Sequence, residues 1–149
     1  MKKNRAKAQV KKGFPGWAWG VIALAVVLAV VLGVYLNSPP ASTSLYPAEV
    51  SIAQAAEKRD QGAFILDVRE PEEWEQVHIP GATLIPLGEL PNRLNEVPKE
   101  MEIVVVCRSG NRSAQGRDIL RNAGYTQVTS MAGGVTQWQA QGLETATGQ

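Results

Sequence analysis

Short apolar runs alternate with stretches of helical periodicity along most of the chain. Four runs predict strands: residues 63–68 (AFILDV), 82–87 (ATLIPL), 102–107 (EIVVVC) and 126–131 (TQVTSM). The run at 102–107 is β-branched and apolar on both faces, which is typical of a central strand in a parallel sheet covered by helices. Helical patterns lie between the runs, at residues 52–60, 71–76, 88–97, 113–124 and 133–142. This alternation predicts an α/β fold of three layers, with a mostly parallel central sheet flanked by helices.

Several helix boundaries are marked by their residue types. Ser51, with Gln54 three residues later, forms a capping box before the first of these helices, and Gly62 is a stop signal after it. Pro71, followed by acidic residues, suits the first turn of a helix. Pro91 interrupts the pattern at 88–97, so we expect only a weak helix there.

A separate apolar stretch of twenty residues, WAWGVIALAVVLAVVLGVYL, precedes this pattern at residues 17–36 and carries no charge. As a helix it would be about 30 Å long, which matches the hydrocarbon thickness of a bilayer. Trp17 and Trp19 mark one end and Tyr35 the other, where aromatic rings favour the membrane–water interface. The stretch therefore predicts a transmembrane helix.

The residues before this stretch predict its orientation. Residues 1–16 hold six Lys or Arg residues and no acid, which places the N-terminus in the cytoplasm and the rest of the chain on the periplasmic or external side. A cleaved signal peptide shares the basic start, but its apolar region is only about 7–15 residues long and usually ends at an A-x-A site. Small residues at 41–43 leave cleavage, and hence secretion, open. We expect an uncleaved, single-pass signal anchor.

The rest of the chain divides into a linker, a domain and a tail. Residues 37–47 (NSPPASTSLYP) are rich in Pro and Ser and predict a linker; residues 48–143 carry the α/β pattern; residues 144–149 form a polar tail that we expect to fray. Beyond residue 37 the chain is net acidic, which argues against sequence-independent binding of nucleic acid.

Cys107 is the only cysteine, and it ends the run predicted as the central strand. Ligand sites in parallel α/β sheets form beyond the carboxyl ends of the strands. In the loop that follows, Gly110 and Asn111 are residue types that adopt left-handed conformations, and Arg108 and Arg112 bring permanent positive charges. Inward-pointing amides, the next helix N-terminus and the arginines would all stabilise a thiolate and lower the pKa of its thiol.

The alternative is a purely structural role for Cys107, because a free cysteine often serves as a small apolar residue at the end of a strand. The coincidence of strand end, glycine, asparagine, two arginines and a following helix favours the chemical interpretation. Arg117 and Arg121, four residues apart on the predicted helix, are better explained as a solvated helix face.

At these residues the chain resembles the rhodanese-like sulfurtransferase family. The matching segments are LDVREPEEWEQVHIPGA at residues 66–82, VVVCRSGNRS at 104–113 and MAGGVTQW at 131–138. They follow the family's order and cover the domain. One departure is Val77, where the family usually has glycine before the histidine.

The resemblance implies a persulfide on Cys107 that accepts sulfur from a small donor such as thiosulfate and passes it to a thiol or cyanide. It needs no metal and no organic cofactor, and a protein partner is an open alternative. The implied substrate-binding positions are Arg108, Ser109, Gly110, Asn111, Arg112 and Ser113. Asp67 and Arg69 would brace the site; His78, the only histidine, would be structural rather than a general base; Trp138 would pack in the core.

Three other functions remain open. Cysteine-dependent phosphatases use Cys-x5-Arg, whereas Cys107 and Arg112 are separated by four residues, and the shorter loop suits a sulfur atom better than a phosphate. A non-catalytic rhodanese-like scaffold would usually lack the cysteine. A redox sensor would have no resolving cysteine within the chain, which leaves only a mixed disulfide with a partner.

Overall fold

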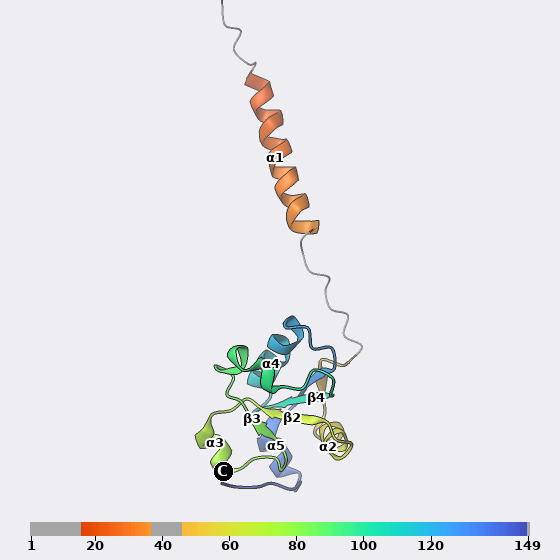
Figure 1. The fold of residues 1–149 in the computed structure, drawn as a ribbon, viewed down its shortest axis with the longest axis vertical. Helices are drawn as coiled ribbons and strands as arrows, with labels where there is room; N and C mark the ends of the chain where they lie inside the picture. The colour runs from red at the N-terminus through yellow and green to blue at the C-terminus, as the bar shows by residue number, and fades with distance from the viewer. Residues whose placement is uncertain (1–15, 37–45, 149) are drawn as a thin grey trace, which may run out of the picture. The chain divides into compact units, whose positions relative to one another are not determined.

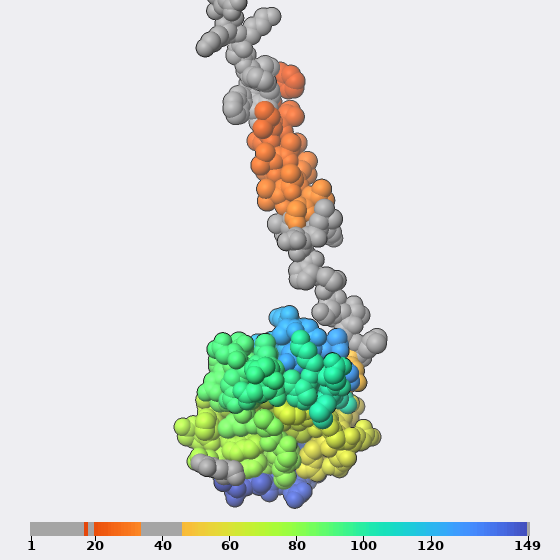
Figure 2. All heavy atoms as spheres, in the orientation of Figure 1, coloured from red at the N-terminus to blue at the C-terminus, as the bar shows by residue number. Residues whose placement is uncertain are grey.

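The computed structural model describes residues 16–36 and 46–148. The basic residues 1–15, most of the predicted linker and Gln149 lie outside the described residues. The chain separates into two units, Met1–Ala41 and Ser42–Gln149. Figure 1 gives the order of the elements, and Figure 2 shows how closely the elements of the second unit pack against one another.

A helix, α1 (Gly16–Leu36), forms where the apolar stretch predicts one. Among the described residues, however, no helix has the length and apolarity needed to cross a membrane. The transmembrane prediction for residues 17–36 is therefore not supported by the described part of the chain.

The second unit is built on a five-stranded sheet in the order β1-β5-β4-β2-β3, and every pair is parallel. Its strands are β1 (Glu49–Val50), β2 (Phe64–Asp67), β3 (Thr83–Leu84), β4 (Ile103–Val106) and β5 (Val128–Met131). The apolar run ending at Cys107 is thus the central strand, as predicted, and all four of its residues are buried. The short β1 was not predicted, because two residues carry no periodicity.

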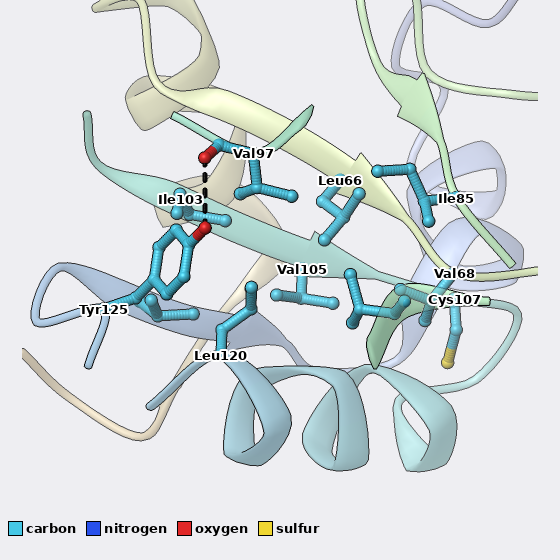
Figure 3. Packing of buried hydrophobic residues seen from close by; sticks show 11 residues of the cluster. Leu66, Val68, Ile85, Val97, Ile103, Val105, Cys107, Leu120 and Tyr125 are labelled. Carbon is cyan, nitrogen blue, oxygen red and sulfur yellow. Dashed lines mark hydrogen bonds between the residues drawn. The ribbon is translucent and has the colours of Figure 1, made fainter. Parts of the chain in front are cut away.

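Helices cover both faces of the sheet (Figure 1). They are α2 (Ile52–Asp60), α3 (Pro71–Gln76), α4 (Asn111–Asn122) and α5 (Gly134–Ala140), together with the 3₁₀ helices η1 (Leu90–Asn92) and η2 (Leu94–Glu96). One apolar core joins Leu66 and Val105 of the sheet to Leu120 of α4, as Figure 3 shows. The other joins Val104 to Trp138 of α5. Alternate residues of β4 therefore supply the two cores, which confirms the flanked parallel sheet.

The helix signals in the sequence hold at two sites. Ser51 caps α2 and Gln54 completes the capping box, while Gly62 follows the helix at a φ of +93°. Pro71 begins α3. In contrast, residues 88–97 form two short 3₁₀ turns rather than a weak α-helix, because Pro91 cannot donate a backbone hydrogen bond.

The expected fraying of the tail is wrong for residues 144–148. Ala146 forms an antiparallel bridge with His78, and the amide of Gly148 donates to the carbonyl of Glu75 at 2.8 Å. The indole Nε1 of Trp138 donates to the carbonyl of Glu144 at 2.8 Å. The polar side chains of the tail suggested solvent, but its backbone is what attaches it to the domain.

Candidate active site

Cys107 lies directly after β4, at the carboxyl end of the central strand and at the N-terminal end of α4 (Figure 3). Its side chain is buried, with 1% of its surface exposed. The helix begins at Asn111, two residues earlier than the sequence suggested, so Asn111 and Arg112 belong to its first turn. The turn between strand and helix is consequently tighter than predicted.

A tight loop surrounds the sulfur with hydrogen-bonding groups. The amide of Gly110 donates to Sγ of Cys107 at 3.1 Å. Sγ lies 3.6 Å from Oγ of Ser113, and that hydroxyl donates to the carbonyl of Gly110 at 2.7 Å. Gly110 has a φ of +109°, which confirms the left-handed prediction at this position. Asn111 is helical instead, because Gly110 alone makes the turn.

These groups decide the ionisation of the thiol. Burial by itself raises the pKa of Cys107, but the hydroxyl of Ser113 and the backbone amides of Ser113, Gly110 and Ser109 outweigh it and hold the pKa below the ordinary value. The first turn of α4 adds the positive end of a helix dipole beside the sulfur. The structure therefore holds the thiol of Cys107 in a hydrogen-bonding loop that favours its thiolate form.

The N-terminal end of α5 fixes the orientation of this loop. The amide of Val135 donates to the carbonyl of Cys107 at 2.8 Å, and the amide of Thr136 donates to the carbonyl of Arg108 at 3.2 Å. The N–H of a trans peptide points opposite to its C=O, so the amides of Arg108 and Ser109 point away from α5. Gly134 allows this approach, since a Cβ there would collide with the carbonyls of Cys107 and Arg108.

Arg112 is near the loop but already has a partner. Its Nη1 and Nη2 donate to the two carboxylate oxygens of Glu73 at 2.7 and 2.8 Å, a bidentate pair between α4 and α3. The hydrogen bond from Arg112 lowers the pKa of Glu73, and Glu73 raises the pKa of Arg112. The sequence did not single out Glu73, because neighbouring acids on α3 look alike until the helix is placed.

Asp67 and Arg69 form a fully buried ion pair at the end of β2. Nη2 of Arg69 lies 2.7 Å from Oδ2 of Asp67, and Nε donates to both carboxylate oxygens at 2.9 Å. The guanidinium also donates to the carbonyls of Glu73 and Val77, at 3.2 and 2.8 Å. The pair therefore ties α3 and the segment after it to the sheet.

A pocket of about 270 Å³ adjoins the loop, between α3 and α5. Its walls are Arg69, Glu73, Gln76 and Val77 on one side and Val135, Thr136 and Gln139 on the other, with Arg108 between them. Of the predicted substrate-binding residues only Arg108 lines it. Ser109 and Asn111 are exposed at the surface of the loop, while Gly110 and Ser113 are buried beside the sulfur.

The remaining motif residues lie in the framework. His78 stacks on Trp74, with ring centroids 3.9 Å apart, and its Nδ1 is 3.0 Å from the carbonyl of Trp74. None of the contacts of His78 among the described residues is with Cys107. Trp138 is 1% exposed and packs in the core. Val77 has a φ of −165°, extended backbone that any residue adopts, so the departure from glycine costs nothing here.

The fold and the loop define a class: a parallel α/β domain with one buried, acidified cysteine after its central strand. Residues 51–141 match the family described as the rhodanese-like domain, and the chain belongs to that family. The resemblance carried by the three sequence motifs is confirmed as far as the family is concerned.

Relatives support the same assignment. The chain is 37% identical over 83 residues to a sulfurtransferase from Allochromatium vinosum (56% of this chain, 78% of the relative), and 34% identical over 117 residues to thiosulfate sulfurtransferase 16, chloroplastic, from Arabidopsis thaliana (70% and 98%). It is 39% identical over 92 residues (60% of this chain) to the putative sulfur carrier protein YrkF of Bacillus subtilis, and spans about half the length of that relative, 50%. A rhodanese-related protein from Thermoplasma volcanium superposes with a TM-score of 0.63 at 27% identity, covering 67% of this chain and 98% of that one.

Proposed function

We propose that the protein is a sulfurtransferase that carries sulfane sulfur as a persulfide on Cys107. The thiolate attacks the outer sulfur of thiosulfate; the new bond joins Sγ to that sulfur, and the S–S bond of thiosulfate breaks with its electron pair leaving on sulfite. A thiol or cyanide acceptor then attacks the outer sulfur, and Sγ departs as the thiolate. No external oxidant or cofactor enters this cycle.

The observation that carries this proposal is the environment of the sulfur in Cys107. The amide of Gly110 and the hydroxyl of Ser113 lie at hydrogen-bonding distance from Sγ, and the pKa is lowered despite burial. Amides that stabilise a thiolate also suit the persulfide anion, which bears its charge one atom further out. Family membership and two sulfurtransferase relatives agree with this assignment.

Arg112 has a different part from the one that the sequence suggested. Both terminal nitrogens of its guanidinium donate to Glu73, so Arg112 orders the first turn of α4 and is not free to bind the sulfur donor. Arg108 is exposed and lines the pocket beside the loop, so it is the better candidate for contact with an anionic substrate.

Intact-mass measurement of the full chain after thiosulfate treatment tests the proposal. We expect a gain of one sulfur atom, removed by cyanide with formation of thiocyanate and absent in Cys107→Ser. A chain that gains no sulfur and forms no thiocyanate would support the scaffold alternative. Release of phosphate from an aryl phosphate, lost in Cys107→Ser, would support the phosphatase alternative.

We further propose, on the sequence alone, that residues 17–36 anchor the domain at a membrane with the domain outside the cytoplasm. The support is the run without charge, its aromatic ends and the six basic residues before it. Alkaline carbonate extraction should leave the full chain in the membrane pellet, and a reporter fused after residue 149 should be active only outside the cytoplasm. Release into the supernatant would overturn the anchor, and a cytoplasmic reporter signal would overturn the topology.

A further inference from the structure

Cys107 is not among the residues that line the pocket between α3 and α5, so the sulfur itself does not form a wall of it. The pocket nevertheless adjoins the loop that holds the sulfur closely. Arg108, which lines it, follows Cys107 directly in the chain, and the amide of Val135, another lining residue, donates to the carbonyl of Cys107. A molecule in this pocket would therefore lie next to the peptide that carries the nucleophile.

The charges around the pocket nearly cancel, and one positive charge is left over. Arg69 is neutralised by Asp67 at 2.7 Å, and Glu73 is neutralised by Arg112. Among the described residues nothing pairs with the guanidinium of Arg108. The pocket thus presents a single uncompensated positive charge to a ligand. One carboxylate can pair with it, whereas a second would lose its water without gaining a counter-charge.

The size and lining of the pocket point to an organic molecule. A volume of about 270 Å³ is close to the lower end of small-molecule sites, about 300 Å³, and exceeds what a five-atom ion such as thiosulfate needs. Gln76, Thr136 and Gln139 supply amide and hydroxyl groups, and Val77 and Val135 supply apolar surface. This mixture of a few polar groups and an apolar wall is typical of small-molecule sites.

We propose that this pocket binds the sulfur acceptor, and that it selects a small thiol bearing one negative charge, which Arg108 holds. The inference rests on the proposed function and names its acceptor class. The acceptor thiolate attacks the outer sulfur of the Cys107 persulfide; a new S–S bond forms on the acceptor, and the bond to Sγ breaks with its electron pair returning to Sγ. The acceptor leaves as a persulfide and the starting thiolate is restored.

Glu73 acts in this arrangement as a residue that sets the charge of the pocket. Its carboxylate lines the pocket and also holds Arg112. Replacing it with glutamine removes one negative charge and releases the Arg112 guanidinium. The variant should therefore bind a thiol with a second carboxylate better than the unchanged protein does. The proposal thus predicts an improved activity as well as a weakened one.

The test compares thiols of similar size and different charge as acceptors from the persulfide of the full chain. They are 2-mercaptoethanol, 3-mercaptopropionate and mercaptosuccinate, which carry zero, one and two carboxylates besides the thiol, compared at equal thiolate concentration. We expect the lowest KM for 3-mercaptopropionate. In Arg108→Gln this KM should rise about tenfold, the size of one charge-assisted contact. In Glu73→Gln the preference should shift towards mercaptosuccinate.

Lys99→Gln is the matched control, because it removes the same charge from an exposed side chain that contacts Ala123 and Tyr125 away from the pocket. It should leave the order of the three thiols unchanged. Equal KM values for all three thiols, or equal effects of Arg108→Gln and Lys99→Gln, would overturn the acceptor pocket while leaving cyanide discharge of the persulfide, and so the proposed function, intact.

A binding measurement separates the pocket from the chemistry. The unreactive thioether 3-(methylthio)propionate should bind the full-length Cys107→Ser protein in calorimetry, and its affinity should fall about tenfold when Arg108→Gln is added. If no persulfide forms but this binding is seen, the proposed function fails and the anion pocket stands. If persulfide forms normally but the thioether does not bind, the anion pocket fails and the proposed function stands.

Discussion

The loop that holds the sulfur of Cys107 and the neighbouring pocket lie side by side at the carboxyl edge of the sheet, but different groups form them. The loop is mainly backbone: the amide of Gly110 reaches Sγ, and the amides of Val135 and Thr136 hold the loop carbonyls. The pocket is made of side chains, with two arginines, one glutamate and three neutral polar residues among its walls.

On the proposed function, this difference would separate the reaction from its specificity. A backbone loop keeps its geometry whatever its exposed side chains are, so the same sulfur transfer would be compatible with different acceptors. A side-chain pocket changes with each substitution, so charge and size preferences can shift without disturbing the nucleophile. Mutations in the two regions should therefore have different consequences, in stability, in the rate of persulfide formation and in the titration of the thiol.

The buried pair beneath the pocket should give the largest loss of stability. Asp67→Asn leaves the guanidinium of Arg69 buried without its counter-charge, and breaking such a pair costs about 3–5 kcal/mol. Urea unfolding of the full chain measures it. Arg93→Gln, which breaks exposed ion pairs with Glu89 and Glu96, should cost far less, because these charges are screened by solvent. Similar losses in both variants would show that the buried pair has no special role.

Gly134→Ala should damage the loop without touching any charged group. Alanine at a φ of +60° costs about 1–2 kcal/mol, and the collision of its Cβ with the carbonyls of Cys107 and Arg108 adds about 1–3 kcal/mol. Because the loop must move, we expect persulfide formation to fall more than tenfold, measured by intact mass against time. An unchanged rate would mean that α5 does not position the nucleophile.

Gly142→Ala is the matched control for that substitution. Gly142 has a comparable φ of +73°, but nothing lies within 4 Å of its added Cβ. This variant should lose only the conformational cost of about 1–2 kcal/mol and keep its rate of persulfide formation. Comparing the two variants therefore separates the cost of a positive φ in alanine from the effect of displacing the loop.

Ser113→Ala should raise the pKa of Cys107, because it removes the hydroxyl that stabilises the thiolate while the burial remains. In the unchanged protein the rate of persulfide formation should level off at a pH below that of an ordinary cysteine, since the thiolate is already formed. In the variant the thiolate absorbance should develop at higher pH, and the equilibrium between thiolate and thiol should shift about tenfold towards the thiol, the effect of one hydrogen bond to a charged group. Ser109→Ala, in an exposed side chain, should leave the titration in place; equal shifts in both would contradict the assignment to the hydroxyl.

The sequence sufficed for the parts of the fold that depend on local patterns. The alternation of apolar runs predicted the parallel sheet, and the capping box at Ser51 placed the start of α2 correctly. The central strand could be recognised because every residue of β4 is buried, which leaves no polar alternation. Predictions were wrong where local signals compete, as at Pro91 and in the tail, where backbone pairing with His78 outweighs a polar composition.

Only the part of the site formed by residues close together in the sequence could be predicted. Cys107, Gly110 and Ser113 are neighbours along the chain, so their assembly around the sulfur follows from a strand, a turn and a helix. Glu73 and Gly134 come from α3 and α5, and no local pattern indicates that they meet the loop. The partner of Arg112 therefore required the tertiary structure.

The ion pair between Glu73 and Arg112 should have the smallest effect on stability, and its contribution should decrease as the pH falls. The hydrogen bond from Arg112 lowers the pKa of Glu73 in the folded protein, so the pair stabilises the fold above the ordinary carboxyl pKa of about 4.3 and loses this contribution as the pH falls through the folded value. Glu73→Gln should cost up to about 1 kcal/mol near neutral pH, because the pair is partly solvated, and almost nothing in acid. Urea unfolding at several pH values measures this, with Glu72→Gln on the exposed side of the same helix as the control for lost charge. A difference between the Glu73 variant and the unchanged protein that does not depend on pH would show that packing rather than charge joins α3 to the loop.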